Sequence, residues 1–267
     1  MEIISIGSSS SGNSYILTNG KNNFIVDAGI SGKRTKEALT KLKIHEDSIR
    51  GIFITHEHND HIKSINMIGK LFPAAKIFLS LGTYKNSDRF MKIPEERINI
   101  IKKDQQIKLG GAFINTFELS HDAAEPIGYT FDNGESKAAI VTDTGTITDE
   151  ILENIKDSNS VVLEANHEIS MLKVSSYPYD IKRRILSKYG HLSNDLTGET
   201  LNKILEYRIK NNLNKKPMKI LLGHLSKDNN TPLNALTTVK YHVKSSGLME
   251  HSNLKIGIAC PDKMVKI

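Results

Sequence analysis

The sequence predicts an α/β (α+β) protein in which two β-sheets pack together and helices cover their outer faces. Short apolar runs typical of strands recur along the chain, and segments with helical spacing lie between them. The first half is rich in strands and has few helices, which favours two sheets packed face to face. A chain of 267 residues with 38% hydrophobic content can also bury a substantial core. We therefore expect one domain over residues 1–267.

The expected strands and helices follow from the period of the apolar residues. In chain order, the strand-like runs are Glu2–Ile6, Ser14–Leu17, Asn23–Val26, Gly51–Ile54, Lys76–Leu79, Ala112–Phe117, Ile127–Phe131, Ala138–Val141, Ser160–Leu163, Met218–Leu222 and Leu254–Ile258. The helical patterns are Lys33–Leu42, Lys63–Leu71, Thr148–Ile155, Asp180–Lys188, Asp195–Asn211 and Pro232–Ser245. The polar stretch 211–217 resembles a linker, but the next strand follows it at once, so it does not separate domains.

The composition favours a cytoplasmic protein. No apolar stretch approaches the ~20 residues that span a bilayer, and residues 1–5 lack the features of a secretory signal. The single cysteine, Cys260, cannot form an internal disulfide, which agrees with a reducing compartment. The net charge of +6 favours polyanions such as nucleic acid as partners, although so modest an excess is also common in proteins that bind none.

A cluster of histidines after one strand predicts a metal site. His56, His58, Asp60 and His61 fall within six positions and follow the apolar run 51–54. Side chains two apart on an extended backbone project to the same side, so His56 and His58 can share one ion. Asp60 and His61 lie where the chain turns and can reach a second ion. One short segment thus supplies two adjacent sites.

Five further apolar runs end in a residue that could bind metal or act in catalysis. These residues are Asp27, His121, Asp143, Glu164 and His224. Catalytic groups are held most accurately at the ends of rigid elements, so five such endings indicate a shared rim around one site. A core or surface histidine and a plain turn residue remain the alternatives for individual members.

These histidine and aspartate side chains are enough to bind two adjacent metal ions, each of which needs about three ligands plus a bridging anion. The expected ligands are His56, His58 and His121 for the first ion, Asp60, His61 and His224 for the second, and Asp143 as the bridge. A histidine-rich set suits zinc, while carboxylates at both sites admit manganese or iron.

In this order of motifs the chain resembles the metallo-β-lactamase superfamily. The matching motifs are an Asp after an early strand, His-x-His-x-Asp-His, a lone His, a bridging Asp and a final His, here from Asp27 to His224. The resemblance implies a four-layer αββα sandwich with a dinuclear metal site along one edge. It also implies that Asp27 orients a ligating imidazole and is not itself a ligand.

Further segments resemble the YycJ (WalJ) branch of nucleases in that superfamily. They are the serine-rich opening 7–14, Glu164–Glu168, Tyr177–Pro178, Lys182–Asn194 and Gly223–Asn230. The resemblance implies a 5′ to 3′ exonuclease that acts on double-stranded DNA, with a link to DNA repair and possible mismatch-repair proteins as partners. DNA is therefore favoured over RNA as the substrate.

His191 separates the nucleases of this superfamily from many relatives. In such nucleases, a histidine near a helix start pairs with a glutamate and acts on the scissile phosphate without binding metal. His191 precedes a helical pattern here, and Glu164 could be its partner, while Asp60 would orient the attacking water. A helix-cap neighbour without a catalytic role is the alternative for His191.

Basic residues just before His191 could guide a nucleic-acid backbone into the site. The candidate substrate-binding residues are Lys182, Arg183, Arg184, Lys188 and His167. For the basic residues, a solvated helix face is an equal alternative, and His167 could instead have a local structural role. The serine-rich opening is either a flexible linker or a tight turn near the site whose N–H groups contact phosphate.

Two other functions compete with a nuclease. The first is a hydrolase of small esters, thioesters, lactams or phosphodiesters, which would need the metals but neither the Glu164–His191 pair nor a basic approach. The second is a binding or redox module with a di-iron centre. That module normally requires a flavin partner domain, for which the chain offers no further segment.

Overall fold

Residues 1–267 are all described by the computed structural model, and their strands form two seven-stranded sheets. The first sheet has the order β14 (Val265–Lys266), β1 (Glu2–Gly7), β2 (Ser14–Thr18), β3 (Asn23–Val26), β4 (Ile49–Phe53), β5 (Lys76–Ser80) and β6 (Ile98–Ile101). The second has the order β13 (Leu254–Ile258), β12 (Met218–Gly223), β11 (Ser160–Glu164), β10 (Lys137–Val141), β9 (Ile127–Asp132), β8 (Ala112–Glu118) and β7 (Gln106–Leu109).

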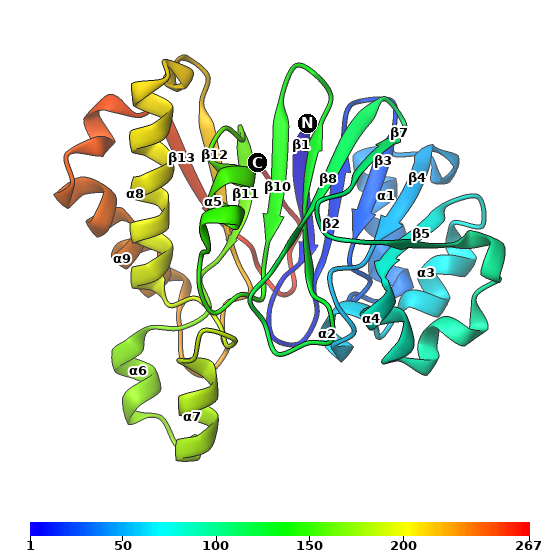
Figure 1. Cartoon of the computed structure of the whole chain (residues 1–267), viewed down its shortest axis with the longest axis horizontal. Helices are drawn as coiled ribbons and strands as arrows, with labels where there is room; N and C mark the ends of the chain where they lie inside the picture. Colours follow the sequence, from blue (N-terminus) through cyan, green and yellow to red (C-terminus); the bar gives the residue numbers. More distant parts are fainter.

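Helices cover the outer face of each sheet (Figure 1). On the first sheet lie α1 (Gly32–Leu42) and α3 (Ile65–Leu71), and on the second lie α5 (Asp149–Ile155), α8 (Asn194–Lys210) and α9 (Pro232–Ser245). The shorter helices are α2 (Asn59–Ile62), α4 (Leu81–Lys85), α6 (Ile169–Val174) and α7 (Tyr179–Ile185). Single turns of 3₁₀-helix occur at Glu46–Ser48, Asp88–Lys92, Glu95–Arg97, Leu213–Lys215 and Leu248–His251.

Three separate apolar clusters fill the three spaces between these four layers. Along β3, Phe24 and Val26 join the cluster between the sheets, while Ile25 joins the cluster under α1 and α3. The third cluster joins the second sheet to α5, α8 and α9. Because successive side chains of a strand point to opposite faces, a strand buried on both faces is apolar throughout, as these runs are. The expected αββα sandwich is confirmed.

The expected strands and main helices agree with the structure to within a few residues. Missed were β6, β7, β14, α2, α4 and α6. The strands β6, β7 and β14 are short and lie at sheet edges, where only one of their ten residues is buried and no continuous apolar run marks them. No helix combines the length and the apolar character needed to cross a bilayer.

The parallel parts of both sheets bring the site together. β3, β4, β5 and β6 run parallel, as do β10, β11, β12 and β13. The carboxyl ends of parallel strands meet at one edge of a sheet, and ligands bind in open α/β folds at such edges. The short helix α2 lies at the lower edge of the first sheet in Figure 1, and α6 and α7 project downward on the side of the second sheet.

Candidate metal centre

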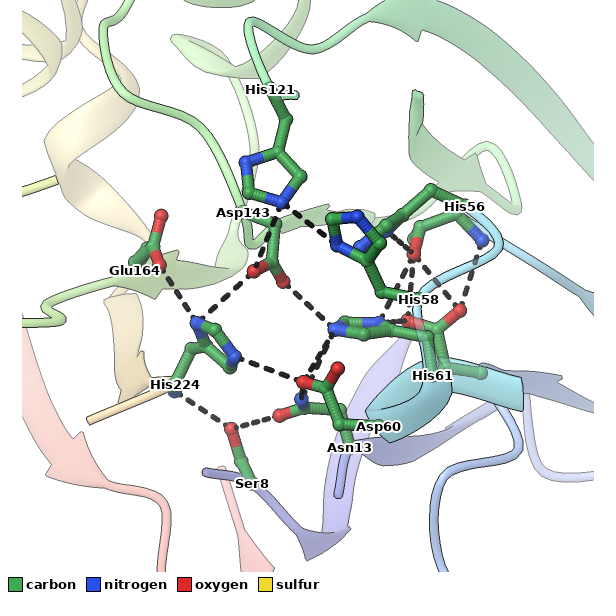
Figure 2. Close-up of polar contacts among 12 residues, drawn as sticks. Ser8, Asn13, His56, His58, Asp60, His61, His121, Asp143, Glu164 and His224 are labelled. Carbon is green, nitrogen blue, oxygen red and sulfur yellow. Dashed lines mark hydrogen bonds and ion pairs between the residues drawn. The ribbon is translucent and has the colours of Figure 1, made fainter. Parts of the chain in front are cut away.

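The expected ligands converge at this edge. Figure 2 shows Asp143 at the centre, with contacts to His61, His121 and His224. Four groups of side chains each place one nitrogen or oxygen per residue within 4.8 Å of the others. They are His56, His58 and His121; His56, His61 and Asp143; Asp60, His61 and His224; and Asp143, Glu164, His191 and His224.

Strained backbone holds three of the site residues. Asp27, Asp143 and His224 follow β3, β10 and β12 and have φ values of 62°, 62° and 54°. A residue other than glycine rarely adopts this left-handed conformation, which costs about 1–2 kcal/mol. Such strain persists where the surrounding structure determines it and is concentrated at functional sites. The sequence gives no sign of this conformation.

Hydrogen bonds turn one nitrogen of three imidazoles toward the centre. His61 Nδ1 lies 2.8 Å from Asp27 Oδ2, and His121 Nδ1 lies 3.0 Å from the carbonyl of Gly190. His224 Nδ1 likewise lies 2.8 Å from Glu164 Oε1. Each Nδ1–H therefore donates outward, which leaves the Nε2 lone pairs for the centre. Metal-binding histidines are oriented in this way.

The first expected ligand set is His56, His58 and His121. His56 is completely buried, and its Nε2 has no hydrogen-bond partner. His58 Nδ1 lies 3.2 Å from His121 Nε2. Burial lowers the pKa of His56 well below its ordinary value and also lowers that of His121. Neutral imidazoles with inward lone pairs are the form that binds a cation.

The second expected ligand set is Asp60, His61 and His224. Asp60 Oδ2 lies 3.3 Å from both His61 Nε2 and His224 Nε2. Asp143 faces both sets, since Oδ2 lies 2.9 Å from His61 Nε2 and Oδ1 lies 3.8 Å from His121 Nε2. Asp143 is thus in the position of a bridge.

The charges of the second set depend on one another. Burial opposes ionisation of Asp60 and Asp143, but His61 and His224 hold the pKa of both carboxyls well below the usual range. Burial likewise opposes a charge on the two imidazoles, yet the facing carboxylates, with Asp27 and Glu164 among them, raise the pKa of His61 and His224 well above its ordinary value. Without a cation the set holds protons, which a divalent cation would replace.

These residues fit two divalent cations. The donors are imidazole nitrogens and carboxylate oxygens, which suit zinc, manganese or iron. Nε2 of the buried His56 has no hydrogen-bond partner. Buried polar atoms are normally partnered, so a bound cation would supply the partner that no side chain does.

The serine-rich opening lies at the site, but it acts through side chains. Asn13 is completely buried, and its Nδ2 donates to Asp60 Oδ2 at 3.2 Å. Ser8 Oγ donates to Asn13 Oδ1 at 2.9 Å and accepts from the backbone N–H of His224 at 2.8 Å. This turn therefore holds Asp60 and His224 in place. The sequence marked the turn but not Asn13.

Glu164 is shared between His224, an expected metal ligand, and His191. His191 Nδ1 lies 2.8 Å from Glu164 Oε1, the same oxygen that His224 Nδ1 contacts. The other oxygen accepts the backbone N–H of Thr144 at 2.9 Å and that of Leu192 at 3.4 Å. Burial opposes the charge, but the facing His191 and the side-chain hydrogen bonds from His191 and His224 lower the pKa of Glu164 to about 2. Glu164 is therefore a carboxylate at neutral pH.

The expected substrate-binding residues have different surroundings. Arg183 and Lys188 are exposed, whereas Arg184 pairs with Asp122. Lys182 Nζ donates to the carbonyls of residues 173 and 175, at 2.8 Å and 2.6 Å. His167 is only 1% exposed, and neither of its ring nitrogens has a partner. The structure thus presents neither Lys182 nor His167 as a free group to a substrate.

A cavity of about 800 Å³ borders the site beside His121. Its lining includes the acidic residues Glu118, Glu125, Asp149 and Glu150, and Lys103 is its basic residue. Lys103 is paired with Glu118 at 2.6 Å. The cavity is therefore a poor place for a phosphodiester backbone.

Comparison with known proteins settles the family. A model described as the beta-lactamase superfamily domain matches residues 22–208. The chain belongs to the metallo-β-lactamase superfamily. It is 32% identical to the exodeoxyribonuclease YycJ of Bacillus anthracis over 91% of this chain and 89% of that protein. It is also 32% identical to the exodeoxyribonuclease WalJ of Streptococcus pneumoniae, over 96% and 93% of the two chains.

Solved structures agree on the fold of this superfamily member. The metallo-β-lactamase fold protein YhfI from Bacillus subtilis superimposes with a TM-score of 0.68 over 99% of this chain and 98% of that one. The two sequences are 15% identical, so this likeness shows the fold alone.

Proposed function

We propose that the chain is a metal-dependent phosphodiesterase that degrades DNA as an exonuclease. The observation that carries the proposal is His191, which shares Glu164 with His224 and belongs to neither of the two expected ligand sets. A hydrolase of small esters, thioesters or lactams needs the ligands but has no use for this further imidazole. The relatives named exodeoxyribonucleases support the same function.

The cluster supplies the chemistry that phosphodiester hydrolysis needs. Divalent cations bound there would lower the pKa of a water molecule and neutralise charge on the phosphoryl group. Asp60 orients the attacking water, since its side chain is 21% exposed and is held by Asn13. His191 Nδ1–H donates a hydrogen bond to the ionised Glu164, so in the imidazolium form the second N–H, at Nε2, passes its proton to the sugar oxygen as the P–O bond breaks, and Nδ1 keeps its hydrogen.

The finer assignments rest on the relatives and on the resemblance of the motifs. They are double-stranded DNA as substrate, 5′ to 3′ polarity, zinc or manganese as the metal, and a role in DNA repair. Mismatch-repair proteins are the partners this role implies. The single domain and the cytoplasmic location expected from the sequence also stay predictions.

A panel of substrates tests the proposed function. The protein, loaded with zinc or with manganese, is incubated with single- and double-stranded DNA labelled at the 5′ or the 3′ end, with RNA, and with a chromogenic phosphodiester. A lactam and a thioester serve as alternative substrates. We expect hydrolysis of duplex DNA with release of label from the 5′ end first, and no hydrolysis after chelation.

The panel also separates the competing functions. Turnover of the thioester or the lactam without cleavage of any phosphodiester would contradict a nuclease. Faster cleavage of RNA than of DNA would keep the phosphodiesterase and overturn the choice of DNA.

A further inference from the structure

One projecting element next to the site carries a net positive charge. Residues 169–190, here called the α6–α7 arm, contain α6, α7 and their connections and project beyond the sheets (Figure 1). The arm has five basic residues, namely Lys173, Lys182, Arg183, Arg184 and Lys188, and one acidic residue, Asp180. Five basic residues minus one acidic residue give the arm a net charge of +4.

The two most exposed large apolar side chains of the arm stand at the two ends of one connection. Val174 ends α6 and is 86% exposed, and Tyr179 begins α7 and is 80% exposed. Both flank the connection 175–178. Neighbouring exposed apolar residues that are flanked by polar ones are typical of interaction sites. Basic residues next to an exposed aromatic ring suit nucleic acid, because the charges contact phosphates and the ring packs on a base.

The base of the arm is attached to the rim of the metal centre. The backbone carbonyl of Gly190 accepts a hydrogen bond from His121 Nδ1, and the backbone carbonyl of Lys188 accepts one from Ser120 Oγ at 2.7 Å. The carbonyl of Tyr189 accepts the backbone N–H of Asp122 at 3.1 Å. Because of these hydrogen bonds, a nucleic-acid strand that binds to the arm has a fixed position relative to the expected metal ligands.

The arm is a better place for a nucleic-acid backbone than the cavity that borders the site. The cavity beside His121 is lined by acidic residues, so an anionic backbone is repelled there. Within the arm, the Lys182 ammonium is occupied by backbone carbonyls and Arg184 by Asp122. Lys173 and Arg183 are exposed and are free to contact phosphate.

We propose that the α6–α7 arm is a nucleic-acid-binding element that holds the substrate at a distance from the scissile bond. Lys173 and Arg183 contact phosphates, and Val174 and Tyr179 pack on bases or sugars. This inference rests on the proposed function for its substrate class, but binding can be measured without hydrolysis.

The charge part is tested with Lys173→Glu/Arg183→Glu. Its matched control is Lys41→Glu/Lys240→Glu, two exposed lysines on α1 and α9 with the same change in net charge. Binding of the metal-loaded proteins to a labelled duplex with phosphorothioate linkages is followed by fluorescence anisotropy at several salt concentrations. We expect Kd to rise about tenfold or more in the arm variant, with a salt slope smaller by about 2. The control should remain close to the wild type.

The apolar part is tested with Val174→Ser/Tyr179→Ser. Its control is Met91→Ser/Leu233→Ser, which removes two similarly exposed apolar side chains, 77% and 72% accessible, elsewhere on the molecule. The arm variant should bind the duplex several-fold more weakly with an unchanged salt slope, because no phosphate contact is lost. Metal content and the thermal midpoint verify that each variant is intact.

The outcomes separate the arm from the proposed function. Arm variants that bind DNA like their controls would overturn the arm, whether or not the wild type cleaves phosphodiesters. A wild type that binds DNA through the arm but cleaves no phosphodiester would support the arm and overturn the function. Arm variants that no longer bind phosphatidylglycerol vesicles but bind DNA normally would show that the arm binds a membrane, which would contradict our proposal.

Discussion

Asn13 is the side chain through which the serine-rich turn reaches the metal ligands. It contacts Asp60 directly, and Ser8 extends this contact to the backbone of His224. Its neighbour Ser10 is exposed and takes no part. A buried asparagine with its donors and acceptors satisfied fixes the orientation of the carboxylate beside it. Asn13 is therefore a positioning residue for Asp60.

We predict that Asn13→Ala weakens metal binding by roughly tenfold or more, because partners that orient a ligand typically contribute 10–100-fold to affinity. Titration with zinc followed by calorimetry measures the effect, and Ser10→Ala is the control within the same turn. Equal affinities in the two variants would show that Asp60 does not depend on Asn13.

His167 gives a pH dependence that is separate from the metal ligands. Burial lowers the pKa of His167 to about 4, below its ordinary value of 6.5. The folded chain holds this ring neutral while the unfolded chain protonates it, so stability is present above pH 6.5 and is lost as the pH falls toward 4.

The free energy of unfolding falls between pH 7 and pH 5. We predict that this fall is smaller by about 2 kcal/mol in His167→Gln than in the wild type. Urea unfolding of the chelated proteins at the two pH values measures the difference, and chelation excludes the pH dependence of metal binding. The same loss in wild type and variant would place the acid sensitivity elsewhere.

At the scale of elements, backbone hydrogen bonds join three segments that are distant in sequence, around Asn13, Gly29 and Asp60. The backbone N–H of Asn13 donates to the carbonyl of Asp60 at 2.9 Å, and that of Ala28 donates to His61. Gly29 donates to the carbonyl of Asn13, also at 2.9 Å. A Cβ at Gly29 would overlap the carbonyl oxygen of Asp60, so only glycine fits here.

Gly29→Ala should therefore displace α2 and lower the free energy of unfolding by about 3 kcal/mol. Gly69→Ala in α3 is the control, because a Cβ there meets other atoms only at 3.9 Å. It should be neutral or stabilising by up to about 1 kcal/mol. Denaturant unfolding measures both, and a stable Gly29→Ala with normal metal content would contradict the close packing.

The elements were predictable where a buried face determines the pattern. Strands buried on both faces, such as 160–164, appear as apolar runs that end in polar residues. The edge strands and α2 were missed because short or half-exposed segments carry little periodicity. The ligand types followed from their spacing, whereas the sharing of Glu164 and the role of Asn13 depend on tertiary contacts that spacing does not encode.

At the scale of the whole molecule, the apolar layers and the metal ligands are separate. The three apolar clusters hold 20, 19 and 18 buried residues, none of which is a ligand. Hydrophobic burial on this scale supplies most of the stability of a domain. The metals add to it only by their affinity for the folded state.

Chelation should accordingly lower the melting temperature and leave the chain folded at 25 °C. Calorimetry and far-ultraviolet circular dichroism, with and without chelator, measure the two effects. Loss of the cooperative transition on chelation would show that the metals hold the layers together.

The central claim is that His191 acts in catalysis without holding metal. The measurement is phosphodiester hydrolysis by His191→Ala, with metal content determined on the same samples and with the exposed His45→Ala as control. We predict that both variants keep the metal content of the wild type, and that His191→Ala loses roughly 10²-fold or more in kcat, the scale of a positioned acid–base group. Full activity of His191→Ala at normal metal content would contradict the account, and loss of one ion would make His191 a ligand.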